Sequence, residues 1–156
     1  SWFACGLSPA ECTALDIELG SCRAQQTVEA LAALVALRGW ASHWHGRRLR
    51  LRVKSDSVSA LILVLRMKTS GRASGIIARE VALDIAASCY APALAEHVPG
   101  VANVVADALS RRFEPGCTFA VPRCLLEVPE LELPPRDASY YRTLGAPPAT
   151  PAKHLD

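Results

Sequence analysis

Residues 47–68, RRLRLRVKSDSVSALILVLRMK, predict a strand that leads directly into a helix. The first half alternates leucine or valine with arginine or lysine, which is the period-two pattern of a strand with one buried face. Asp56 falls at the carboxyl end of this strand, and Ser55 or Asp56 can cap the helix that follows, SVSALILVLRMK. If Asp56 only caps that helix, it needs no further role.

Strand and helix patterns continue on both sides of this unit. Residues 26–40, QTVEALAALVALRGW, predict a helix that is apolar around most of its circumference, so we expect it to be largely buried. The apolar spacing after Ser74 predicts another helix, which ends near Cys89. The other expected elements are a strand at 1–8, a short helix or loop at 9–20, a loop at 69–75, a strand at 93–98 and a helix at 101–112. Strands that alternate with helices indicate an α/β domain built in layers.

The composition excludes several classes of protein. The chain has 156 residues, of which 51% are hydrophobic, and a formal net charge of +2. These values fit one folded domain and exclude an intrinsically disordered chain. No apolar run reaches the roughly 18 residues of a membrane-spanning helix, and no signal-peptide pattern opens the sequence. The six cysteines form no CxxC pair, which disfavours a zinc site or a disulfide framework.

The prolines mark a boundary within the chain. Eight of the eleven follow residue 112, and the sequence beyond that residue has no sustained apolar period. We therefore predict a folded domain at 1–112 and a proline-rich, mostly disordered tail or linker at 113–156.

The near-neutral total charge hides a strongly basic middle of the chain. Residues 38–79 contain ten basic residues and one acidic residue, Asp56, and so have a net charge of +9. Such a segment attracts phosphate groups, and binding to it would depend on salt. The alternative is a solvated basic face that binds nothing.

Three acids occupy positions from which their side chains could converge. Glu29 lies inside the helix at 26–40, Asp56 ends the central strand, and Asp107 lies on the last expected helix. Carboxylates that gather without basic partners repel one another, and hard divalent cations such as Mg²⁺ or Mn²⁺ usually pair them. Two such ions about 3.5–4 Å apart can cleave a phosphodiester. The alternatives are a helix cap for Asp56 and an ordinary solvated acid for Asp107.

The sequence HVPGVANVVADALSRR, residues 97–112, closely resembles the end of the ribonuclease H domain in Ty3/gypsy-type retrotransposon polyproteins. Those domains end in a His-x-Pro-Gly-x-x-Asn-x-x-Ala-Asp-x-Leu-Ser-Arg run, and every fixed position of that run is present here. Upstream, QQTVEALAALVALRGW resembles the family's helix with the second catalytic carboxylate, and LRVKSDSVSAL resembles its strand that ends in the third. The resemblance covers about residues 1–112.

The resemblance implies a ribonuclease H-like layered fold, with a mixed sheet flanked by helices, that cleaves the RNA strand of RNA–DNA hybrids. It implies that Glu29, Asp56 and Asp107 bind two Mg²⁺ or Mn²⁺ ions. It also implies that His97 assists proton transfer or product release, with a structural role as the alternative, and that Asn103 supports the site. Basic residues would contact the phosphates of the hybrid: Arg47, Arg48, Arg50, Arg52, Lys54 and Arg72. A reverse transcriptase in the same polyprotein, no membrane partner, and an intracellular location, cytoplasmic or nuclear, are implied as well.

One departure from the family pattern concerns the first catalytic carboxylate. The family carries it as an aspartate on the first strand, and nothing here matches it, since Asp16 lies in an expected helix or loop. SWFACGLS resembles the third strand of the family's opening hairpin, which implies that the sheet lacks its first strands. We therefore expect little or no hydrolytic activity from this chain. Two alternatives stay open: an inactive nucleic-acid-binding or decayed remnant of the same fold, and an unrelated α/β domain whose acids are caps and surface residues.

Overall fold

The computed structural model of the chain describes residues 1–44, 49–69, 71–87 and 90–144. Within these residues, α-helices combine with one small sheet of two parallel strands, which places the chain in the α/β class. The elements in chain order are α1 (Pro9–Leu15), α2 (Cys22–Gly39), β1 (Leu49–Ser55), α3 (Val58–Arg66), α4 (Arg72–Ala87), β2 (Tyr90–His97) and α5 (Val104–Ser110). Short 3-10 turns connect several of them.

The sheet follows from the alternating pattern around residue 50. Leu51, Val53 and Ser55 are half-buried on one face of β1, while the basic residues between them are exposed on the other face. The neighbouring strand β2 pairs with β1 in parallel, from Leu49 opposite Tyr90 to Ser55 opposite His97. Parallel neighbours require a crossover connection, and helices α3 and α4 supply it.

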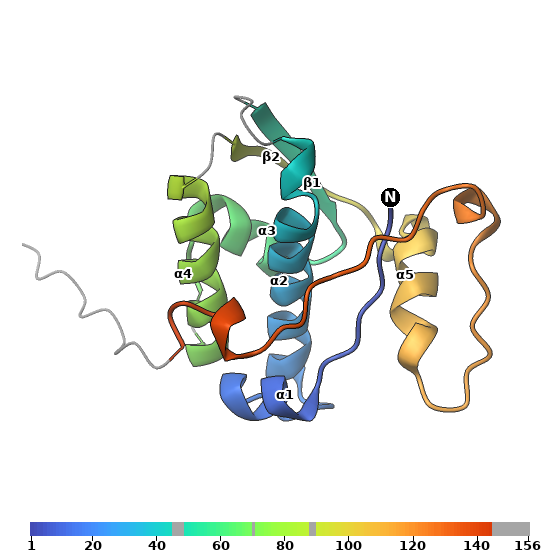
Figure 1. Cartoon of the computed structure of the whole chain (residues 1–156), viewed down its shortest axis with the longest axis horizontal. Helices are drawn as coiled ribbons and strands as arrows, with labels where there is room; N and C mark the ends of the chain where they lie inside the picture. Colours follow the sequence, from blue (N-terminus) through green and yellow to red (C-terminus); the bar gives the residue numbers. More distant parts are fainter. Residues whose placement is uncertain (45–48, 70, 88–89, 145–156) are drawn as a thin grey trace, which may run out of the picture.

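The core lies between helices α2, α3 and α4, which pack against one another (Figure 1). Its fully buried side chains include Leu34 and Val35 of α2, Leu63 of α3, and Ile77 and Val81 of α4. The largely apolar surface predicted for α2 therefore packs against the apolar positions of α4. In contrast, α5 makes its main element contacts with the 3-10 turns on either side of it, and Figure 1 shows it apart from the packed helices.

The predicted strand at 1–8 is wrong. Within this segment only Trp2 forms a bridge, with Glu130. The backbone N–H of Trp2 donates to the carbonyl of Pro129, at 3.2 Å, and the N–H of Leu131 donates to the carbonyl of Trp2, at 2.7 Å. The segment is extended because it docks on the C-terminal part of the chain, not because it belongs to the sheet.

Several helix starts also differ from the expectation. α2 begins at Cys22 rather than at residue 26, and α4 begins at Arg72, inside the expected loop at 69–75. The hydroxyl of Ser57, not the side chain of Ser55 or Asp56, caps α3 by accepting a hydrogen bond from the N–H of Ala60, at 3.2 Å. The last helix begins at Val104, after a 3-10 turn at Gly100–Ala102, and not at residue 101.

Residues 113–144 differ from the expected disordered tail. They contain little regular secondary structure, but residues 128–144, which we call the tail strap, run across the front of α2 to α4 (Figure 1). Tyr141 of the strap is buried, and Arg136 and Arg142 form ion pairs with acids of α1 and α4. Residues 145–156 lie outside the described part of the chain.

Candidate functional site

Two of the predicted site residues meet at the carboxyl end of the sheet. Because β1 and β2 are parallel, Ser55 pairs with His97, and Asp56 follows directly. The Nε2 atom of His97 lies 3.1 Å from the backbone carbonyl oxygen of Asp56, and this contact requires the proton on Nε2. Gly100 is close as well, because a Cβ atom placed on it would lie 4.0 Å from Oδ2 of Asp56. The side chain of Asp56 is exposed. Because Ser57 is the N-cap of α3, Asp56 does not cap that helix.

Glu29 lies in the first half of α2. Its side chain is half-buried, and the amide nitrogen of Gln25, one turn earlier, donates a hydrogen bond to its Oε1 atom at 3.3 Å. An amide donor reduces the cost of a partly buried carboxylate without neutralising it. Glu29 is the one acidic residue of α2.

Asp107 lies on α5 and is exposed. Arg111, one turn later on the same helix, places its Nε atom 3.2 Å from Oδ2 of Asp107. This pair raises the pKa of Arg111, mainly through the hydrogen bond to Asp107. Asn103 precedes the helix without a capping hydrogen bond from its side chain, and its carbonyl accepts the N–H of Asp107 at 3.0 Å.

The three carboxylates do not form a metal site in this structure. Within the described residues, no group of three or more His, Cys, Asp or Glu side chains lies close enough to hold a metal ion. Glu29, Asp56 and Asp107 are all described, and Asp107 is already paired with an arginine on a helix that packs mainly against its own flanking turns. The residues present therefore do not fit a bound Mg²⁺ pair, and we derive no catalytic step through one.

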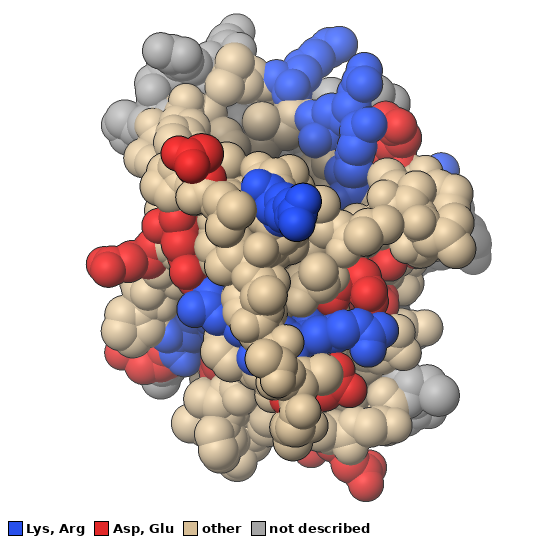
Figure 2. Space-filling model, turned by 90° about the vertical axis from the view of Figure 1, so that its right-hand side faces the viewer, with Lys and Arg blue, Asp and Glu red and all other residues tan. Residues whose placement is uncertain are grey.

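The basic residues of β1 form an exposed face. Arg50, Arg52 and Lys54 all lie on the solvent side of the strand. Glu96 of β2 forms ion pairs with two of them: its Oε1 atom lies 3.1 Å from Nζ of Lys54, and its Oε2 atom lies 3.8 Å from Nη1 of Arg52. Figure 2 shows basic side chains gathered at the top of the face that it draws, whereas lower down they are interspersed with acids. Arg47 and Arg48 lie outside the described residues.

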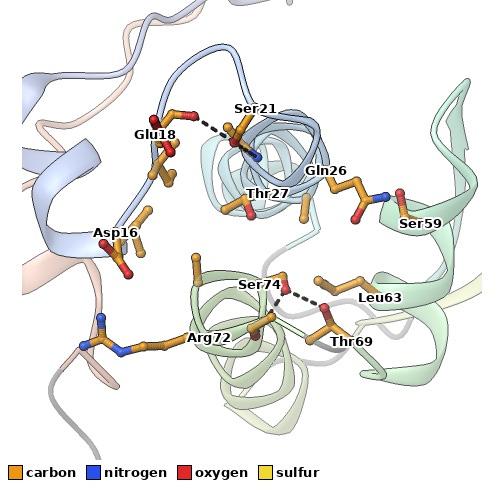
Figure 3. Close-up of a pocket in the computed structure, with 16 residues that line it drawn as sticks. Asp16, Glu18, Ser21, Gln26, Thr27, Ser59, Leu63, Thr69, Arg72 and Ser74 are labelled. Atoms are coloured by element: carbon orange, nitrogen blue, oxygen red, sulfur yellow. Dashed lines mark hydrogen bonds between the residues drawn. The ribbon is translucent and has the colours of Figure 1, made fainter.

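A pocket of about 670 Å³ lies on another part of the molecule, between the connection from α1 to α2 and the helices α2, α3 and α4. Figure 3 shows Asp16 and Arg72 at one end of it and Gln26 and Ser59 at the other. Arg72 is the first residue of α4, and its side chain is exposed. It lines this pocket and is not one of the basic residues on the exposed face of β1. In the wall of the pocket, the hydroxyl group of Thr69 donates a hydrogen bond to the hydroxyl oxygen of Ser74.

Two buried carboxylates were not identified from the sequence. Glu80 is fully buried, and Glu11 is 3% exposed. Burial alone would raise the pKa of Glu80, but hydrogen bonds from Arg38, Thr143 and Arg142 outweigh it and lower that pKa from 4.5 to about 2. Glu11 has a lowered pKa for the same kind of reason, since Arg136 donates to it at 2.6 Å.

These two acids are structural. Their arginine partners come from the tail strap and from α2, which are distant in sequence. Glu11 also has a local partner, because it forms a capping box with Ser8, whose N–H donates to the carboxylate of Glu11 at 3.0 Å. The sequence offered one signal for each: Glu80 stands among the apolar positions of an amphipathic helix, and Glu11 completes the Ser-x-x-Glu pattern of a capping box.

Comparison with protein-family models, curated proteins and solved structures finds no match to this chain. Among the described residues, no helix is long and apolar enough to cross a membrane.

Proposed function

We propose that this chain is a ribonuclease H-like domain related to those of Ty3/gypsy-type retrotransposon polyproteins, and that it binds RNA–DNA hybrids. One observation carries the proposal. The motif HVPGVANVVADALSRR begins at His97, and the parallel pairing of β1 and β2 puts His97 in contact with Asp56, 41 residues earlier. A strand-end aspartate beside the first residue of that motif supports a common site for both.

The binding surface in this proposal is the exposed face of β1. Arg50, Arg52 and Lys54 project from it at alternate positions, and a hybrid offers a regular row of phosphates. Recognition would rest on phosphate contacts, on the shape of the duplex and on 2′-hydroxyl groups rather than on base edges. The parent polyprotein would supply a reverse transcriptase and act inside the cell, in the cytoplasm or nucleus.

Hydrolysis belongs, in this proposal, to an intact parent that binds two Mg²⁺ or Mn²⁺ ions. This chain carries no match to the first catalytic aspartate, and the other three acids do not gather in the structure. We therefore propose that the chain binds hybrids and has little or no turnover, as an inactive remnant of the fold would.

Binding is tested by titrating a fluorescently labelled RNA–DNA hybrid with the full chain at several salt concentrations. The logarithm of the binding constant should fall linearly with the logarithm of the salt concentration. Arg50→Gln should weaken binding and reduce the slope by about 1. The matched control is Arg123→Gln, which changes an exposed arginine in a 3-10 turn outside the basic segment 38–79. Equal effects of both substitutions, or no hybrid binding at all, would contradict the proposal.

Turnover is tested separately by incubating the hybrid with Mg²⁺ and the full chain. We expect no cleavage above the level given by the Asp107→Asn variant. Mg²⁺-dependent cleavage that Asp107→Asn abolishes would overturn the proposed inactivity while leaving the binding proposal standing.

A further inference from the structure

The pocket between the connection from α1 to α2 and the helices α2, α3 and α4 is formed by the helical part of the fold. Its volume of about 670 Å³ lies in the range of sites that bind small molecules. None of the described residues that line it belongs to β1, to β2 or to the extended segment 1–8. The pocket is therefore independent of the sheet and of the sheet's edges.

The lining of this pocket combines a buried apolar part with exposed charges. Leu15 and Leu63 line it with exposed fractions of 0% and 2%, so they form its floor. Asp16, Glu18 and Arg72 also line it, and these three residues are exposed at its rim. A bound molecule would cover the apolar floor and meet the charged groups where the pocket opens to solvent.

The connection from α1 to α2 holds its two acids on a fixed backbone. Ile17 is buried, and its N–H donates to the carbonyl of Cys12 at 2.8 Å. The hydroxyl of Ser21 donates to the carbonyl of Glu18 at 2.9 Å. Asp16 and Glu18 flank the buried Ile17, and both line the pocket. Because this backbone is already ordered, binding at its carboxylates would have a lower entropic cost.

The charged side chains of the lining are unpaired within the described part of the chain. The side chains of Asp16, Glu18 and Arg72 form neither an ion pair nor a hydrogen bond with any described residue. Figure 3 shows Asp16 and Arg72 at the same end of the pocket, the acid on the connection and the arginine at the start of α4. A negative and a positive group that border one space without pairing can be bridged by a molecule that carries both charges.

The opposite end of the pocket offers hydrogen bonds rather than charges. Gln26 of α2 and Ser59 of α3 lie there (Figure 3), and the amide of Gln26 forms no hydrogen bond with a described residue. An amide both donates and accepts. The described lining contains no aromatic side chain on which a flat ring could stack. It contains two acids and one arginine, which disfavours a ligand with a net negative charge.

We propose that this pocket binds a small dipolar molecule with an ammonium group, a carboxylate and a neutral polar side chain, the chemistry of a free α-amino acid. The ammonium group would pair with Asp16 and Glu18, and the carboxylate would pair with the guanidinium of Arg72. The rest of the molecule would point towards Gln26 and Ser59, where a polar side chain can form hydrogen bonds. This inference does not depend on the proposed binding of hybrids, which uses the exposed face of β1.

The proposal is tested by titrating the isotope-labelled full chain with L-glutamine and following the backbone amide signals by NMR. Saturable shifts should appear at residues 16–18 and 71–74, with a dissociation constant on the order of 1 mM, as suits a few exposed contacts. N-acetyl-L-glutamine lacks the ammonium group, and L-glutaminamide lacks the carboxylate. Each should bind about threefold or more weakly, because each can form ion pairs at only one side of the pocket.

Two substitutions assign the contacts. Asp16→Asn should weaken the binding of L-glutamine about threefold, but should leave that of N-acetyl-L-glutamine unchanged. Arg72→Gln should weaken L-glutamine to the same extent, but should leave L-glutaminamide unchanged. Arg66→Gln, an exposed position of α3 outside the pocket, is the matched control and should change none of these values. Asp16 has a left-handed backbone with φ of 54°, which asparagine also tolerates, so the variant keeps the fold.

Three results would overturn the proposal. The first is the absence of saturable shifts in the pocket up to about 100 mM L-glutamine, since the exposed charges would then be solvated and bind nothing. The second is binding of L-glutaminamide as tight as that of L-glutamine, which would reduce the effect to attraction of a cation by two acids. The third is an equal loss of affinity for Arg66→Gln and Arg72→Gln, which would assign the effect to general charge and not to this pocket.

Discussion

At the scale of single residues, the structure depends on two buried carboxylates that bind arginines from distant parts of the chain. Glu80 of α4 accepts hydrogen bonds from Arg38 of α2 at 2.6 Å, from Arg142 at 3.1 Å and from the N–H of Thr143 at 2.6 Å. Glu11 of α1 accepts from Arg136 at 2.6 Å and from the hydroxyl of Tyr141 at 2.9 Å. A buried charge is tolerable only when its bonding capacity is filled in this way.

Replacing Glu80 with glutamine should destabilise the protein by about 3 kcal/mol, because Arg38 and Arg142 would lose a buried counter-charge. The free energy of unfolding in urea measures the effect. Glu132→Gln, at an exposed position, is the control and should change it by less than about 0.5 kcal/mol. A change at Glu80 as small as the one at Glu132 would show that the network contributes little.

Glu80 also predicts a dependence of stability on pH. Its pKa is lowered from 4.5 to about 2 in the folded protein, so folding favours the charged form. The stabilisation it contributes is fully present above pH 4.5 and is lost as the pH falls from 4.5 towards 2. Urea denaturation at a series of pH values should therefore show a steeper loss of stability in this window for the native sequence than for Glu80→Gln. Parallel curves for the two proteins would assign the acid sensitivity to other groups.

At the scale of elements, the start of α3 separates a structural residue from a candidate functional one. Ser57 caps the helix, whereas Asp56 next to it is exposed and caps nothing. Ser57→Ala should cost about 1 kcal/mol of stability, as the loss of an N-cap does. Asp56→Asn should leave the free energy of unfolding within about 0.5 kcal/mol of the original. If Asp56→Asn destabilises the protein as much as Ser57→Ala does, Asp56 has a structural role that its exposure does not reveal.

Elements defined by local periodicity were predictable, and elements defined by distant partners were not. The alternation at 49–55 and the apolar stripes of α2 and α4 depend on residues within a few turns, so the sequence alone predicted β1 and the packed helices. SWFACGLS has the composition of a strand, but whether an extended segment joins a sheet depends on its neighbour. Here the neighbour is Glu130, which lies outside any strand.

The same limit applied to the candidate site. The position of Asp56 at a strand end follows from the local pattern, and the parallel pairing of β1 with β2 then brings His97 beside it. The convergence of Glu29, Asp56 and Asp107 was only a hypothesis, because it required three elements to be placed relative to one another. The structure leaves Asp107 on a helix that packs mainly against its own flanking turns, and pairs it with Arg111.

At the scale of the whole molecule, the tail strap makes the N-terminal and C-terminal parts of the described chain one body. Trp2 is 7% exposed, and its indole nitrogen donates to the carbonyl of Val128 at 2.9 Å. Leu131 and Leu133 pack so closely on Gly39, at the end of α2, that a Cβ atom there would lie 3.0 Å from each of them. Proline-rich composition therefore describes the conformation of this segment, which is extended and irregular, but not its degree of order.

Removal of residues 113–156 should abolish cooperative folding. A chain that ends at residue 112 lacks Arg136, Tyr141, Arg142 and Thr143. Glu11 would then be buried without its arginine. Glu80 would lose its hydrogen bonds from the strap and keep the one from Arg38 of α2. Losing an arginine from each of two buried carboxylates costs several kcal/mol per site, which is comparable to the whole stability of a small domain.

A chain that ends at residue 144 keeps every one of these contacts and should unfold in urea at nearly the same midpoint as the full chain. Tryptophan fluorescence follows the transition, since Trp2 is buried under the strap. If the chain that ends at residue 112 shows a cooperative transition near that midpoint, the strap is dispensable and the domain ends where the proline-rich sequence begins.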